Sequence, residues 1–76
     1  MNIIYIVYEV EDYEGIITVG VFSTEELAKN KVLMSRQDKF YYYIIDYWKV
    51  NENLIQRSFY INGNWEDTNW PFNYPK

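Results

Sequence analysis

The chain has 76 residues, no cysteine, no histidine and a formal net charge of −4. This length indicates one domain, residues 1–76, and so small a domain hides only about 60% of the surface that its unfolded chain exposes. The missing residue types exclude a disulfide framework and the common zinc sites, so we expect no metal and no cofactor. The negative charge argues against nucleic acids and anionic membranes as partners, since both favour an excess of lysine and arginine.

Aromatic residues make up 21% of the chain, with nine tyrosines. A small fold without disulfides or metals has to be stabilised by aromatic burial or by association. No run approaches the roughly 18 apolar residues of a membrane span, and the opening MNIIYIVYEVE has no basic lead. We therefore expect a cytoplasmic protein that does not enter a membrane.

Residues 3–10 and 16–22 predict a β-hairpin. Both segments, IIYIVYEV and IITVGVF, are rich in the β-branched and aromatic residues that favour strands. Between them, EDYEG is typical of a turn. Residues 1–26 hold no base and six acids, so we expect one end of the molecule to be acidic; the six are Glu9, Glu11, Asp12, Glu14, Glu25 and Glu26.

The next stretch, STEELAKNKVLMSRQ, predicts a helix of about three turns. Ser23 is placed to cap it, Glu26 to complete a capping box, and Phe22 to pack on the first helical turn. Apolar residues recur at helical spacing, which indicates a buried stripe formed by Leu27, Ala28, Val32 and either Met34 or Ser35.

The second half of the chain predicts three more strands. FYYYIIDYWKV at 40–50 and LIQRSFYI at 54–61 have strand composition, and Asn62-Gly63 is a strong hairpin signal that leads into a short strand through residues 64–66. The tail WPFNYPK, with two prolines, cannot continue a central strand. The predicted fold is α+β in the order ββαββ, with a four- to five-stranded, mainly antiparallel sheet and one helix on one face.

Alternation along each strand divides the sheet into two faces. One is mainly aliphatic and includes Ile4, Ile6, Ile17, Val19, Ile44, Ile55 and Phe59, with Asp46 and Arg57 placed to form an ion pair. The other, which we call the tyrosine face, carries Tyr5, Tyr41, Tyr43, Tyr47 and Tyr60 with Thr18, Gln56, Ser58 and Lys49. One helix can cover only one face, and we expect it to cover the aliphatic one.

The tyrosine face then needs another cover, and two hypotheses stay open. The tail can fold back over it through its aromatic residues, which with the nearby Trp65 are Trp70, Phe72 and Tyr74. Alternatively a second protein chain docks there, either a copy of this one or another protein, since half-polar, tyrosine-rich surfaces suit such interfaces.

The sequence contains no clear set of catalytic residues, and we expect that the protein is not an enzyme. Ser23 is explained as a helix cap, and Ser58 has no base beside it in the sequence. The acidic turn lacks the spacing of a calcium loop. Single-stranded nucleic acid can stack on Tyr41, Tyr43 and Tyr47, but only Lys49 supplies charge there, so this is the alternative function.

The stretch VGVFSTEELAKNKV at 19–32, followed by YYYIIDYWKVNENL at 41–54, resembles a small family of uncharacterised bacterial and phage proteins. The resemblance covers about residues 3–54 and rests on the Gly-Val-Phe-Ser run, the acidic helix start and the alternating strand. It implies a protein of a phage or mobile element that binds host machinery, and it supplies no catalytic residues to carry over to this chain; inhibition of a bacterial defence complex is a further implication.

The predicted function is non-catalytic binding of a host protein, with a homodimer as a further option. The predicted partner-binding residues are those of the tyrosine face and the acidic hairpin tip: Tyr5, Tyr41, Tyr43, Tyr47, Lys49, Tyr60, Glu11, Asp12 and Glu14.

Overall fold

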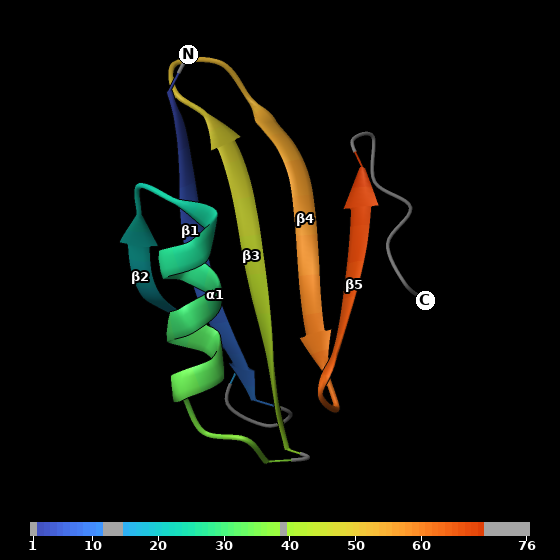
Figure 1. The fold of residues 1–76 in the computed structure, drawn as a ribbon. Coiled ribbons are helices and arrows are strands. Elements are labelled where there is room, and N and C mark those ends of the chain that lie inside the picture. The colour runs from blue at the N-terminus through green and yellow to red at the C-terminus, as the bar shows by residue number, and fades with distance from the viewer. Residues whose placement is uncertain (1, 12–14, 39, 70–76) are drawn as a thin grey trace.

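The computed structural model describes residues 2–11, 15–38 and 40–69, and Figure 1 shows their arrangement. The elements are β1 (Ile3–Glu11), β2 (Gly15–Phe22), α1 (Glu25–Met34), β3 (Tyr41–Lys49), β4 (Leu54–Ile61) and β5 (Asn64–Asn69). The predicted α+β order is confirmed, and so is the fifth strand. The strands form one sheet in the order β2-β1-β3-β4-β5, in which every neighbouring pair is antiparallel.

The hairpin between β4 and β5 has the local geometry that its sequence predicts. Asn62 has φ 53° and Gly63 has φ 80°. Positive φ at both central residues defines the tight turn that matches the twist of an antiparallel pair, and the Asn-Gly dipeptide adopts it at little cost. This turn places β5 directly beside β4.

The helix begins one residue later than predicted. Thr24, not Ser23, is its cap: its hydroxyl accepts the backbone N–H of Leu27 at 3.2 Å, and its carbonyl accepts the N–H of Ala28 at 3.2 Å. Both hydroxyl residues can cap a helix, so the sequence does not distinguish them. Leu27 and Met34, predicted as parts of the buried stripe, are 50% and 86% exposed.

The prediction that the helix covers the aliphatic face is wrong. Buried Ala28 and Val32 pack instead on the tyrosine face, in one cluster with Val7, Ile45 and the rings of Tyr43 and Tyr47. The short side chains of the helix leave room for rings below them. A tyrosine can bury its ring while its hydroxyl reaches a polar group at the margin of the helix, so a ring-rich face is a good support for this helix.

Two register shifts explain why alternation misplaces some side chains. The β1–β2 register shifts at Val7 and Tyr8, and the β3–β4 register shifts at Tyr47 and Trp48. A bulge changes the face on which the following residues lie. As a result Val19 and Ile55, predicted on the aliphatic face, pack with the cluster under the helix.

The opposite side of the sheet, which we call the open face, has no helix on it in the described part of the chain (Figure 1). By register it includes Ile4, Ile6, Tyr8, Val10, Ile16, Thr18, Val21, Tyr42, Ile44, Asp46, Trp48, Leu54, Arg57, Phe59 and Ile61, with Asn64 and Glu66 of β5. The tail from Trp70 on, one of the two covers hypothesised for the tyrosine face, lies outside the described residues. The helix in the described chain is too short and too polar to cross a membrane.

Candidate functional site

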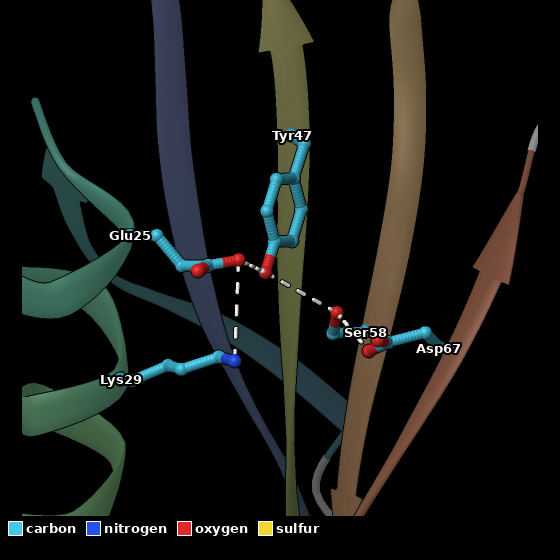
Figure 2. Close-up of polar contacts among 5 residues, drawn as sticks. All are labelled: Glu25, Lys29, Tyr47, Ser58 and Asp67. Atoms are coloured by element: carbon cyan, nitrogen blue, oxygen red, sulfur yellow. Dashed lines mark hydrogen bonds and ion pairs between the residues drawn. The ribbon is translucent and has the colours of Figure 1, made fainter.

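A chain of polar contacts joins the helix to β5 across the tyrosine face (Figure 2). The Tyr47 hydroxyl donates to the Glu25 carboxylate at 2.5 Å, and the Lys29 ammonium lies 3.9 Å from the same carboxylate. On the other side, Ser58 Oγ lies 3.4 Å from the Tyr47 hydroxyl and donates to Asp67 at 2.6 Å. The hydroxyls of Tyr47 and Ser58 both have partners within this chain, which indicates that the chain anchors the helix.

The hydroxyls of Tyr43 and Tyr47 are held neutral by their surroundings. Burial raises the pKa of Tyr43 to about 12, and the nearby Glu9 carboxylate adds to the rise. Burial also raises the pKa of Tyr47 above its ordinary value, and the hydrogen bond to Glu25 is the second cause of the rise. In both cases the anion would lose solvation and face a carboxylate, so neither hydroxyl is a base at neutral pH.

The part of the tyrosine face over β4 and β5 is lined by the rings of Tyr60 and Trp65. Tyr60 and Trp65 have centroids 4.7 Å apart, and the Lys29 ammonium lies 5.1 Å above the Trp65 ring. A hollow of about 270 Å³ lies at the C-terminal end of the helix, between Arg36 and Tyr60. The Arg36 guanidinium donates to the Tyr41 hydroxyl and covers its ring, so this side of the hollow is already paired.

The predicted binding tyrosines do not form one accessible surface. Tyr43 and Tyr47 are 2% and 6% exposed, because the helix lies on them. Tyr5 is half-buried, with its ring edge-on to Tyr47 at 5.1 Å. Tyr41 and Tyr60 are half-buried at the margin of the helix. Of the three rings predicted to stack on nucleic acid, only Tyr41 therefore keeps a partly accessible position.

The charged members of the predicted set are scattered. Lys49 lies 3.5 Å from Glu52 in the turn that follows β3. Glu11 ends β1 and its carboxylate accepts from the Tyr41 hydroxyl at 3.4 Å. Asp12 and Glu14, at the predicted acidic tip, lie outside the described residues.

An ion pair lies at the centre of the open face, as predicted for Asp46 and Arg57. The Arg57 guanidinium donates twice to the Asp46 carboxylate, at 2.5 Å from Nε and 2.8 Å from Nη2. Asp46 is 2% exposed. The two-point geometry satisfies both carboxylate oxygens, which a charge in such a position needs. Tyr8 lies close by, and its pKa is raised by burial and then by the Asp46 charge.

Apolar side chains and rings surround this pair. Val10, Ile44 and Phe59 form a second buried cluster, against which Tyr8, Tyr42 and Ile61 pack. Trp48 lies two residues from Asp46 along β3, opposite Ile4. Its indole N–H is buried without a hydrogen-bond partner among the described residues. The open face is thus apolar at its rim, neutral overall at its centre, and flanked at β2 by Ile16 and Val21, which are 61% and 58% exposed.

The open face is the surface that sequence reasoning missed. Both faces of the central strand are rich in rings and aliphatic residues, and residues 40–50 alternate without a clear polar side. The polar content of the tyrosine face pointed to the wrong side, because its hydroxyls pair with the helix margin. A usable signal was present in the helix: Ala28 and Val32 are small, which favours packing on large rings.

The serine of β4 that was considered for catalysis lies inside the fold. Ser58 is fully buried beside Asp67, so a substrate cannot reach its hydroxyl. The described residues contain no cluster of three or more side chains suited to hold a metal ion.

A family model described as a domain of unknown function, DUF7336, matches residues 2–61. The chain therefore belongs to this family, and the match covers β1 to β4 with the helix. Neither a curated protein nor a solved structure matches the chain.

Proposed function

We propose that this domain is a non-catalytic protein-binding module whose open face docks on a partner protein. The observation that carries the proposal is the open face itself: a sheet side rich in rings and aliphatic groups over which no described segment lies. Contiguous apolar surface of this kind marks interaction sites in small proteins. Fully burying a large apolar side chain contributes about 1.5 to 3 kcal/mol, and a partner would gain part of this at side chains of the face that are exposed or half-buried, such as Ile16, Val21, Tyr42 and Ile61.

The ion pair at the centre of the open face supports a specific protein partner. Asp46 and Arg57 neutralise each other, and Glu66, which pairs with Phe59 on the same face, is negative, so the face does not attract phosphates. Interface cores are depleted of net charge, and tyrosine and tryptophan are enriched in them. Tyr42 and Trp48 flank the pair as the rings that such a partner would contact.

The biological setting of the proposal rests on the resemblance described for residues 3–54. We propose a phage or mobile-element protein that acts in the cytoplasm of a bacterial host and modulates a host protein, with a defence complex as the specific target class. Single-stranded nucleic acid remains the alternative ligand, although burial of Tyr43 and Tyr47 reduces the predicted stacking surface to Tyr41.

The test is capture from a bacterial lysate with the immobilised domain, followed by titration with the purified captured protein. Tyr42→Lys and Ile61→Lys place a charge on the open face, whereas Leu27→Lys and Leu33→Lys place the same charge on the outer side of the helix, where both leucines are about half exposed. We expect the open-face variants to weaken binding at least about tenfold, with the helix variants unchanged.

Two results would contradict the proposal. The first is equal affinity of the open-face and helix variants for the captured protein, with all four folded by circular dichroism. The second is a captured nucleic acid whose affinity falls steeply between low and moderate salt, since counterion release produces that dependence and apolar docking does not.

A further inference from the structure

The hollow beside the end of α1 lies between two parts of the chain that are far apart in sequence. One wall is the link that follows the helix, with Arg36 and Asp38, and the other is Tyr60 with the turn at Asn62 and Gly63. Figure 1 shows this link and this turn at the same end of the sheet. The hollow holds about 270 Å³, slightly less than the roughly 300 Å³ at which pockets for drug-sized molecules begin, so a fitting occupant is a small molecule.

Two opposite charges line this hollow without neutralising each other. Arg36 and Asp38 form no ion pair with each other or with another charge among the described residues. The Tyr41 hydroxyl takes only Nη1 of Arg36, which leaves Nε and Nη2 for another acceptor. Asp38 Oδ1 accepts the Phe40 N–H at 3.0 Å, which leaves Oδ2 for another donor. One wall of the hollow therefore offers a guanidinium and a carboxylate to the same ligand.

The carbonyl groups at the end of the helix are already paired. The negative end of a helix repels an anion mainly through its unpaired carbonyl groups. Here the Val32 carbonyl accepts from Gln37 Nε2 at 2.9 Å, and the Arg36 carbonyl, in the link, accepts from the Tyr43 hydroxyl at 2.7 Å. The chain's own donors thus screen this end of the helix, and the Arg36 guanidinium is left to bind a ligand.

We propose that this hollow binds a free α-amino acid with an aromatic side chain. An α-amino acid carries a carboxylate and an ammonium on one carbon atom, so a single small molecule can pair with Arg36 and Asp38 together. The fork of a guanidinium fits a carboxylate at two points, and a carboxylate accepts hydrogen bonds from an ammonium. A residue within a peptide lacks these two charges, because both groups are converted to amides.

The rest of the hollow suits the side chain of such a ligand. Tyr41, Tyr43 and Tyr60 contribute to its lining, and aromatic rings attract one another in edge-on and offset arrangements. Tyr43 is buried, whereas Tyr41 and Tyr60 are half-buried and keep area for contact. The Tyr60 hydroxyl and the Asn62 amide have no hydrogen-bond partner among the described residues, so they are available to the polar groups of the ligand.

The first test is an NMR titration of the full chain with three probes of similar shape and different charge. L-Phenylalanine carries both charges, L-phenylalaninamide lacks the carboxylate, and hydrocinnamate lacks the ammonium. We expect phenylalanine to shift the backbone amides of Asp38, Asn62 and Gly63 and to saturate. It should bind about tenfold more tightly than either analogue, since a hydrogen bond to a charged group contributes that much.

The second test assigns each charge of the ligand to its residue. Arg36→Gln removes the partner of the carboxylate, so phenylalanine and phenylalaninamide should then bind equally. Asp38→Asn keeps an acceptor for the Phe40 N–H and removes the charge, so phenylalanine and hydrocinnamate should then bind equally. Lys31→Gln is the matched control: it removes the same charge as Arg36→Gln from an exposed helix position outside the hollow and should leave all three affinities unchanged.

Three results would overturn the proposal. One is the absence of shifts at the hollow with phenylalanine at about 20 mM, a concentration above the millimolar dissociation constant expected of so small a ligand. Another is an analogue that binds the natural chain as tightly as phenylalanine, since the hollow would then take a plain anion or a plain cation. The last is equal weakening by Arg36→Gln and Lys31→Gln, which would mean that the net charge of the chain alone governs binding.

These outcomes are separable from those of the proposed function, because the hollow lies on the helix side of the sheet. Tyr42→Lys should weaken partner capture through the open face and leave phenylalanine binding unchanged. Arg36→Gln should weaken phenylalanine binding and leave partner capture unchanged. Circular dichroism shows whether each variant is folded, and both Arg36 and Asp38 are exposed, so their substitution leaves the core intact.

Discussion

The Tyr47 hydroxyl donates a hydrogen bond to the Glu25 carboxylate at 2.5 Å and so ties the first turn of the helix to the central strand of the sheet. Tyr47 is buried and its ring packs beneath the helix, whereas Glu25 is exposed next to Lys29. A side chain predicted to contact a partner is thus a structural support of the monomer.

Tyr47→Phe removes only this hydroxyl. We expect it to lower the free energy of unfolding by about 1.5 kcal/mol, because a hydrogen bond to a charged group is lost and Ser58 Oγ loses a neighbour. Urea denaturation followed by circular dichroism measures it. Tyr60→Phe is the matched control, since the described residues supply no hydrogen-bond partner for its hydroxyl, and it should stay within about 0.5 kcal/mol of the natural chain.

Tyr43→Ala and Tyr42→Ala compare adjacent residues on opposite faces. Tyr43 lies under the helix at 2% exposure, so its truncation leaves a cavity and should cost about 3 to 5 kcal/mol. Tyr42 is half-buried on the open face. Its truncation should lower the free energy of unfolding less than Tyr43→Ala does, and should weaken the affinity for the partner more. Thermal melts and titration measure the two effects. Equal stability losses would mean that a further segment covers the open face in solution.

Arg57→Leu leaves the Asp46 carboxylate without its two donors. Because Asp46 is 2% exposed, we expect a loss of about 3 to 5 kcal/mol in unfolding free energy. The double variant Asp46→Leu with Arg57→Leu should regain most of that loss, since both charges are gone. For comparison, Lys49→Ala breaks the exposed pair with Glu52 and should cost less than about 1 kcal/mol. A double variant no more stable than Arg57→Leu would refute this account of the pair.

Alkaline pH should unfold the domain through its buried tyrosines. The pKa of Tyr43 is about 12 in the folded chain, against an ordinary value of 10 when unfolded. A raised folded pKa means that the stabilisation is complete below pH 10 and is lost as the pH rises toward 12, by up to about 1.4 kcal/mol per pH unit. Absorbance of tyrosinate with circular dichroism follows both events. Tyr43→Phe removes this ionisation. The variant should therefore lose less unfolding free energy than the natural chain between neutral pH and pH 12.

The sequence by itself determined the elements of this protein and their order. Strand composition, the Asn62-Gly63 turn and the helix cap region act through local backbone preferences, and these are read along the chain without knowledge of distant contacts. The Asp46–Arg57 pair was also predictable, since a charge inside an apolar strand needs a partner on the neighbouring strand.

Only the tertiary structure decided which face the helix covers. Both faces of β3 are apolar enough to accept a helix, so the choice depends on the fit of Ala28 and Val32 over the rings of Tyr43 and Tyr47, and on hydroxyls that reach Glu25 and the Arg36 carbonyl. Two bulges then moved Val19 and Ile55 to the helix side. Packing fit and strand register involve residues far apart in the chain, and for that reason alternation within single strands does not resolve them.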